Sequence, residues 1–91
     1  MSPKNSKTRE PREEDHLKAL GMRVRKWREQ KGLTQEQFAP VVGFTRSYIT
    51  EIETGKRNIS FLNLIKLLET LEVDDREVKQ LLHDIYAEKE K

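Results

Sequence analysis

Three short segments of this chain begin with the same combination of residues, and this repeated signature limits the fold more than any other feature. A Ser or Thr that can cap a helix precedes each segment, at Thr34, Thr45 and Ser60. An apolar residue before each cap and another four residues after it can form a hydrophobic staple. The staple pairs are Leu33 with Phe38, Phe44 with Ile49, and Ile59 with Leu64. Each segment is therefore predicted to be a helix with a fixed start.

Glycines end two of these helices. Gly43 and Gly55 stand where a residue in the left-handed region closes a helix, a conformation that glycine adopts at little cost. The three predicted helices span about residues 35–42, 46–54 and 61–71.

Two longer helices flank this central part. Apolar residues recur at steps of three or four in each, which predicts amphipathic helices over about residues 15–31 and 75–88. The first stripe comprises Leu17, Leu20, Val24 and Trp27, and the second comprises Val78, Leu81, Leu82, Ile85 and Tyr86. Asp15 and Asp74 are the expected caps, and Gly32 is the expected end of the first helix. No segment alternates as a strand does, so the sequence predicts an all-α fold of five helices.

Length and composition place the chain among small single-domain proteins. It has 91 residues and no cysteine, which excludes a disulfide framework and a thiolate metal site. No stretch approaches the roughly 20 apolar residues that a membrane-spanning helix needs. The beginning of the chain lacks the apolar core of a secretory signal. We therefore expect a soluble, cytoplasmic protein.

Charge is distributed unevenly along the chain. Residues 1–68 carry fourteen Lys and Arg against eight Asp and Glu, a net +6, whereas residues 69–91 carry four against eight, a net −4. This asymmetry favours contact with a polyanion on one side, although an uneven solvated surface gives the same count. Residues 1–14 are predicted to be a polar, flexible leader. Its basic residues would either follow DNA phosphates or, as we prefer, form an inert tail: Lys4, Lys7, Arg9 and Arg12.

The second and third predicted helices are joined by the turn 43–45, whose length is typical of a helix-turn-helix. Ala39 leaves room for the two helices to cross closely. On a helical wheel, Ile49 and Ile52 lie on one side of the third helix. The opposite side is polar and comprises Arg46, Ser47, Thr50 and Glu51. This pattern predicts a recognition helix for the DNA major groove, although an ordinary amphipathic surface helix has the same division.

The polar side chains of this helix match the chemistry of base edges. Arg46 can donate two hydrogen bonds to guanine, and Glu51 can accept one from the amino group of cytosine. Ser47 and Thr50 can bond a base or contact a thymine methyl group. We therefore predict that these four residues read bases.

Several short motifs occur together between residues 20 and 73. They are Arg23-Val24-Arg25-Lys26-Trp27-Arg28, Lys31-Gly32-Leu33-Thr34-Gln35-Glu36, Phe38-Ala39, Val42-Gly43, Tyr48-Ile49, Ile52-Glu53-Thr54-Gly55-Lys56-Arg57-Asn58 and Leu64. In this combination the chain resembles the phage-repressor-like helix-turn-helix family, also called the XRE or Cro-type family, over more than half of its length. The resemblance implies a DNA-binding domain over residues 15–73, and we assign residues 74–91 to a C-terminal helix.

The resemblance also implies roles for individual residues. Thr45 joins Arg46, Ser47 and Glu51 among the base-reading positions. A second set matches positions that approach backbone phosphates: Gln35, Tyr48, Thr54, Lys56, Arg57 and Asn58. Gln35 is expected in addition to brace the recognition helix. Phosphate contacts of this kind position a protein on DNA without reading its sequence.

Arg28 and Glu53 match a buried ion pair that joins the first and third helices of this family. The simpler interpretation is that Arg28 is one more solvated charge on a basic helix. Pro40 is a departure, because it lies inside the second predicted helix, where a proline costs about 3 kcal/mol. We expect that helix to be kinked or broken, which would shift Gln35 relative to the third helix.

One recognition helix reaches only a few base pairs. We therefore expect a homodimer on an inverted-repeat operator, with half-sites about 34–36 Å apart. The predicted interface is the apolar stripe of the last helix, formed by Val78, Leu81, Leu82, Ile85 and Tyr86. The alternative is that this helix closes the core of its own monomer.

The sequence lacks a nucleophile–base grouping, a phosphate-cradling glycine loop and a metal-ligand cluster. His16 and His83 are interpreted as ordinary surface residues. The predicted function is a sequence-specific DNA-binding transcription regulator, without cofactor or enzymatic activity. The rival interpretation is an antitoxin or protein-interaction module whose main partner is another protein, and salt dependence distinguishes the two.

Overall fold

The structure, a computed structural model, describes the backbone of residues 10–89 and the side chains of residues 10–87. It contains five helices and, within this range, no strand, which confirms the predicted all-α fold. The helices are α1 (Pro11–Gln30), α2 (Gln35–Val42), α3 (Arg46–Glu53), α4 (Phe61–Thr70) and α5 (Asp75–Lys89). None of them is both long and apolar enough to cross a membrane.

Helix α1 begins four residues earlier than predicted, so Asp15 is not its cap. Glu10 occupies the N-cap and forms a capping box with Glu13, and Pro11 stands at the first helical position. A proline fits there because the N–H that it lacks would have no partner inside the helix. Residues 11–14, including Arg12, therefore belong to α1. The other basic residues of the predicted leader, Lys4, Lys7 and Arg9, lie outside the described residues.

Helix α2 spans the predicted residues without interruption, although it contains Pro40. Of the two predicted outcomes, a kinked or a broken helix, the break is therefore wrong. Thr34 and Gln37 form the predicted capping box, with Thr34 Oγ1 accepting from the Gln37 N–H at 3.1 Å. Pro40 is exposed, while Phe38 is buried on the side that faces the rest of the protein. The packing of this buried side and the Thr34–Gln37 capping box offset the loss of the backbone hydrogen bond that Pro40 cannot donate.

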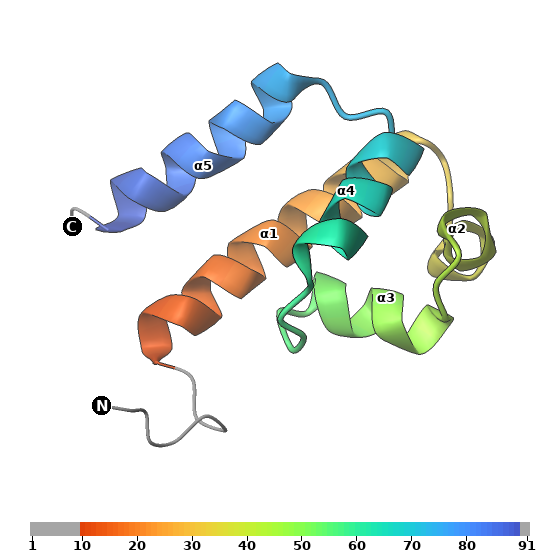
Figure 1. Cartoon of the computed structure of the whole chain (residues 1–91), viewed down its shortest axis with the longest axis horizontal. Helices are drawn as coiled ribbons and strands as arrows, with labels where there is room; N and C mark the ends of the chain where they lie inside the picture. Colours follow the sequence, from red (N-terminus) through yellow and green to blue (C-terminus); the bar gives the residue numbers. More distant parts are fainter. Residues whose placement is uncertain (1–9, 90–91) are drawn as a thin grey trace.

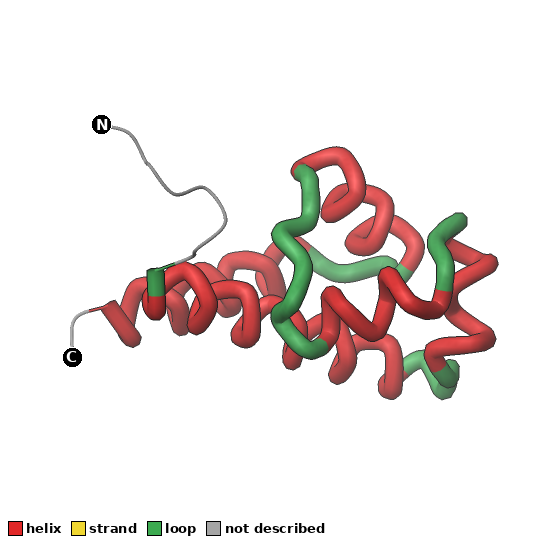
Figure 2. The backbone as a smooth tube through the Cα atoms, turned by 90° about the horizontal axis from the view of Figure 1, so that it is seen from below, coloured by secondary structure: helices red, strands yellow, loops and turns green. Residues whose placement is uncertain are grey.

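One hydrophobic core joins all five helices. Its buried side chains are Val24 and Trp27 of α1, Phe38, Ala39 and Val42 of α2, Ile49 and Ile52 of α3, Leu67 of α4 with the adjacent Leu71, and Leu81 of α5. Figure 1 shows α1 as the long diagonal helix, with α5 returning along one side of it. Helix α3 lies on the other side of α1, and α2 lies at the right of the view. Figure 2, turned by 90°, shows two helices side by side in the left part of the view and most of the loops between helices in its right part.

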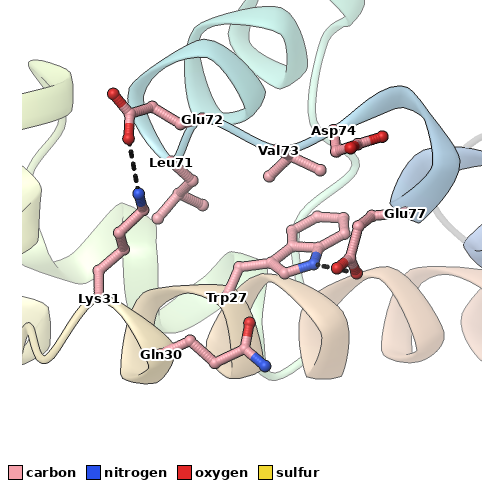
Figure 3. A pocket seen from close by; sticks show the side chains of 8 residues that line it. All are labelled: Trp27, Gln30, Lys31, Leu71, Glu72, Val73, Asp74 and Glu77. Atoms are coloured by element: carbon pink, nitrogen blue, oxygen red, sulfur yellow. Dashed lines mark hydrogen bonds and ion pairs between the residues drawn. The ribbon is translucent and has the colours of Figure 1, made fainter.

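Polar contacts accompany the packing of α5 against α1. Trp27 Nε1 donates to Glu77 Oε1 at 3.1 Å, so the buried indole has a partner for its N–H (Figure 3). Nearer the middle of α5, Arg23 Nη2 donates to Asp84 Oδ2 at 2.9 Å. Together with the buried Leu81, these contacts hold α5 antiparallel to α1.

The connection from α4 to α5 contains a residue in the left-handed region. Glu72 has a φ of +56°, and its carboxylate accepts from Lys31 Nζ at 2.7 Å (Figure 3). Asp74, which follows, accepts from the backbone N–H of Arg76 at 2.7 Å and also from its guanidinium. These hydrogen bonds lower the pKa of Asp74, the predicted cap of α5, to about 2.

The left-handed conformation of Glu72 generates a stability prediction. Glu72→Gly and Glu72→Ala both lose the exposed pair with Lys31, but only Ala retains the Cβ that disfavours this conformation. We expect Glu72→Gly to be more stable than Glu72→Ala by about 1 kcal/mol, as measured by urea unfolding. At ordinary helical positions Ala is the more stable of the two by a similar amount. Finding that ordinary order at residue 72 would contradict the prediction.

Candidate nucleic-acid interface

Helices α2 and α3 form a compact pair at one end of the protein. In Figure 1 α2 is seen almost along its axis, whereas α3 lies across the view, so the two helices are steeply inclined. Gly43 ends α2 with a φ of +87°, and the N–H groups of Gly43 and Phe44 both donate to the Ala39 carbonyl at 2.9 Å. This closed turn places Ile49 of α3 in the core beside α2 and leaves the other side of α3 exposed.

A buried ion pair fixes α3 against α1. Arg28 Nε and Nη2 donate to the two carboxylate oxygens of Glu53 at 2.7 and 3.0 Å, and both side chains are less than a tenth exposed. Arg28 Nη1 also donates to the Leu33 carbonyl at 2.6 Å. Hydrogen bonding to Glu53 raises the pKa of Arg28, against the opposing effect of burial. The pair implied by the family resemblance is therefore present, with two-point geometry.

Gln35, the first residue of α2, connects that helix to α3 through both the nitrogen and the oxygen of its side-chain amide. Its Nε2 donates to Glu53 Oε1 at 3.0 Å, and its Oε1 accepts from the Thr50 hydroxyl at 2.8 Å. Pro40 therefore does not displace Gln35 from the third helix. Thr50, assigned to the base-reading set, is half-buried and is engaged by α2.

A close approach of α1 and α3 depends on a glycine that the sequence analysis did not single out. A Cβ on Gly21 would overlap the carbonyl oxygen of Ile52 and also crowd that of Glu53. The end of α3 can therefore rest directly on α1 only because residue 21 has no side chain. The signal was available, since a glycine in the interior of an amphipathic helix often marks a close backbone contact.

The other predicted base-reading residues lie along the open side of α3. Arg46, Ser47, Thr50 and Glu51 line one shallow hollow of its surface. Arg46 is 62% exposed and lies 3.5 Å from the Glu36 carboxylate. Thr45 is exposed, but its hydroxyl accepts from the Tyr48 N–H at 3.1 Å as the N-cap of α3.

The residues predicted to approach phosphates divide into two groups. Lys56 and Asn58 are exposed on the loop after α3. The Thr54 hydroxyl donates back to the Thr50 carbonyl at 2.8 Å, and the Arg57 guanidinium donates to Glu51 at 2.6 Å. The contact between Arg57 and Glu51 thus holds the loop after α3 against the edge of that helix.

Tyr48 of that set is also held by neighbours. Its hydroxyl accepts from Asn63 Nδ2 of α4 at 3.0 Å, which leaves its own O–H available to donate. The sequence analysis missed Asn63, because no periodic pattern connects a residue of α4 to the recognition helix.

The predicted interface of α5 does not form one exposed stripe. Leu81 is only 7% exposed and belongs to the core of its own chain, and Ile85 packs against that core. Val78 is half-buried, whereas Leu82 and Tyr86 are 45% and 63% exposed. Part of the stripe therefore covers the core of its own chain, and part of it is exposed.

Other exposed apolar side chains were not anticipated. Phe61 and Leu62, at the start of α4, are both 72% exposed. His83 is exposed and His16 half-buried, and the described residues contain no group of three potential metal ligands.

A steep pair of short helices, closed by a left-handed glycine and presenting a polar helix face, defines a helix-turn-helix DNA-binding module.

Comparison with known proteins identifies the family. A family model described as Helix-turn-helix matches residues 24–78. The control protein C.MunI of a Mycoplasma species is 39% identical over 70 residues, which cover 76% of this chain and 90% of that protein. The HTH-type transcriptional regulator y4dJ of Sinorhizobium fredii is 34% identical over 64 residues, or 70% of this chain and 83% of that protein. The chain belongs to the helix-turn-helix family.

A solved structure supports the same assignment. The crystal structure of the restriction-modification controller protein C.AhdI from Aeromonas hydrophila matches with a TM-score of 0.65 and 40% identity, over 75% of this chain and 97% of that one. The predicted family, fold and class of DNA-binding transcription regulator are confirmed. The family consists of DNA-binding regulators rather than enzymes.

The buried ion pair yields a second stability prediction. Arg28→Met leaves the Glu53 carboxylate buried without its partner, which we expect to lower the free energy of unfolding by about 3–5 kcal/mol. Arg25→Met is the matched control, because Arg25 and Glu29 form an exposed pair at 3.0 Å on the same helix. An exposed pair contributes about 0–1 kcal/mol. Equal effects of the two substitutions in denaturant unfolding would show that the buried pair has no special role.

Proposed function

We propose that this chain is a sequence-specific transcription regulator that binds an inverted-repeat operator as a homodimer. The observation that carries the proposal is the exposed polar face of α3, fixed to α1 and α2 through Arg28, Glu53 and Gln35. A rigid recognition helix can place donors and acceptors against base edges at little cost in conformational entropy.

Arg46 is the strongest candidate for direct base recognition. Its side chain is exposed at the first turn of α3, where a guanidinium can reach the two acceptors of guanine in the major groove. Ser47 is exposed one residue further along. Thr45, Thr50 and Glu51 are proposed to contact the same groove while they keep their contacts within the chain.

Phosphate contacts would surround this base-reading face. Lys56 and Asn58 project from the exposed loop after α3, and Tyr48 keeps a hydroxyl proton to donate. Gln35 and Thr54 lie at the edges of α3 and complete the proposed set. Such contacts set the position and orientation of the module on the duplex.

Selection of bound sequences from a random duplex pool tests this proposal. We expect an inverted repeat to emerge, and Arg46→Ala to relax one base position in each half-site, at a cost of roughly 1–3 kcal/mol of binding free energy. The affinity for the selected duplex should fall steeply as salt rises. Failure to enrich any sequence, together with a flat salt dependence, would favour the antitoxin or protein-interaction interpretation.

A homodimer would supply the second recognition helix that an inverted repeat requires. Exposed apolar side chains on α5 (Leu82 and Tyr86) and α4 (Phe61 and Leu62) are the candidates for contact with a second copy. Leu82 and Tyr86 are one helical turn apart, and Phe61 and Leu62 are adjacent, so each pair can form an apolar patch of the kind typical of interaction sites. Leu81 and Ile85 are left out because they cover the core of their own chain.

Sedimentation of two double variants tests the dimer. Leu82→Ser with Tyr86→Ser, and Phe61→Ser with Leu62→Ser, change exposed residues and should leave the fold intact. We expect a dimer for the unmodified chain and a monomer with weaker operator binding for at least one of the variants. An unmodified chain that stays monomeric on its operator would overturn the homodimer.

The relatives favour one biological setting for this regulator. The control proteins among them, and the description of C.AhdI as a restriction-modification controller protein, favour a regulator of that kind. We propose that the chain acts in the cytoplasm, where it meets DNA, without a cofactor and without enzymatic activity.

A further inference from the structure

We propose that Asn63 of α4 is a positioning residue for DNA binding, because it sets the direction in which the Tyr48 hydroxyl points its proton. Tyr48 then meets a backbone phosphate as a hydrogen-bond donor. This inference rests on the proposed function and deepens it. It gives α4, which lies outside the pair of helices α2 and α3, a part in the contact with DNA.

The hydroxyl of Tyr48 has a single hydrogen-bond partner among the residues that the structure describes. Asn63 Nδ2 of α4 donates to this oxygen of α3 at 3.0 Å. An amide nitrogen can only donate, so the phenolic oxygen uses a lone pair for this hydrogen bond. The hydroxyl proton cannot occupy the same direction. It therefore points to the side that Asn63 leaves open.

Both partners of this hydrogen bond are held in place by their neighbours. The Tyr48 ring meets Phe44 edge-to-face at 4.8 Å between centroids, and the Tyr48 backbone N–H donates to Thr45 Oγ1 at 3.1 Å. The Asn63 backbone N–H donates to the hydroxyl of Ser60, the N-cap of α4, at 3.1 Å. Tyr48 and Asn63 are both half-buried. The direction of the hydroxyl is thus set jointly by the turn before α3, by α3 and by α4.

The direction of this one proton matters because of what a phosphate offers. Phosphate oxygens are negatively charged and accept hydrogen bonds, so a neutral hydroxyl binds them only as a donor. A hydroxyl that turned its lone pairs towards the phosphate would repel it. A donor that already points outwards also loses less conformational freedom on binding than one that must first turn.

Substitution of Asn63 by Asp tests the inference, because the two side chains have nearly the same shape. A carboxylate only accepts, so it would take the Tyr48 proton and turn the lone pairs of the hydroxyl outwards. We expect Asn63→Asp to weaken binding at least as much as Tyr48→Phe, which removes the donor and should cost roughly 10- to 150-fold per subunit. Asn63→Ala leaves the hydroxyl free to point either way and should cost less than either.

Competition binding to the duplex that the unmodified chain selects provides the measurement. Tyr48 is uncharged, so Tyr48→Phe should weaken binding to all duplexes alike and leave the salt slope unchanged, whereas the control Lys56→Gln should reduce that slope by about 1. In the Tyr48→Phe background, Asn63→Asp should cost much less than it does alone, and the remainder measures the effect of the added charge itself.

Stability separates this role from a structural one. Residue 63 lies in the first turn of α4, where a negative charge is favourable. We therefore expect Asn63→Asp to keep or raise the free energy of unfolding in urea while its affinity for DNA falls. A loss of stability in proportion to the loss of affinity would contradict the positioning role.

Three further results would overturn the inference. Normal binding by Asn63→Asp would mean that Tyr48 gives its proton to residue 63. An equal cost of Asn63→Asp with and without the Tyr48 hydroxyl would assign its effect to charge alone. Normal binding by Tyr48→Phe would exclude the phosphate contact. An unmodified chain that selects no sequence would instead contradict the proposed function, so the two failures are distinguishable.

Discussion

The buried contact between Arg28 and Glu53 is the constraint on which the arrangement of the helices depends. Two opposite charges removed from water are tolerated only when their hydrogen-bonding groups find partners, and here Leu33 and Gln35 complete the set. Those partners come together only when α1, α2 and α3 occupy their positions. The protein must pair these two buried charges in order to fold, and the same pairing fixes the orientation of α3. Gly21 contributes by letting the end of α3 approach α1 without a side chain between them.

Local signals in the sequence were sufficient to predict most helix boundaries. The cap, staple and glycine around α2 fix both of its ends, so its bounds match the prediction in spite of Pro40. The start of α1 was placed too late for an equally local reason. Glutamate is not among the residues usually preferred as helix caps, and the run of charges before Leu17 gives no periodic signal, so Glu10 was not distinguished from Asp15.

Contacts between helices were harder to predict. Helical periodicity indicates which side chains share a face, but it does not indicate which residues of other helices pack against that face. The wheel placed Thr50 on the open side of α3, yet its hydroxyl donates to Gln35 of α2. The same limit applies to α5, where one apolar stripe contains the buried Leu81 and the exposed Tyr86. Where the family pattern specified a pair of partners, as for Arg28 and Glu53, both residues were identified. Where the partner lay outside that pattern, as Asn63 does for Tyr48, it was not.

The way in which α5 is attached has a consequence for motion in solution. Among the described side chains of α5, Leu81 alone is fully buried in the core, and Ile85 is partly buried against it. Helix α5 also makes polar contacts with Trp27 and Arg23 of α1. An element with so few buried apolar contacts can open as a cooperative unit while the remainder stays closed. Amide protons of α5 would then exchange with solvent well before those of α3, whose Ile49 and Ile52 are fully enclosed. If two copies pair through α5, as proposed above, that contact could change while the helix-turn-helix keeps its shape.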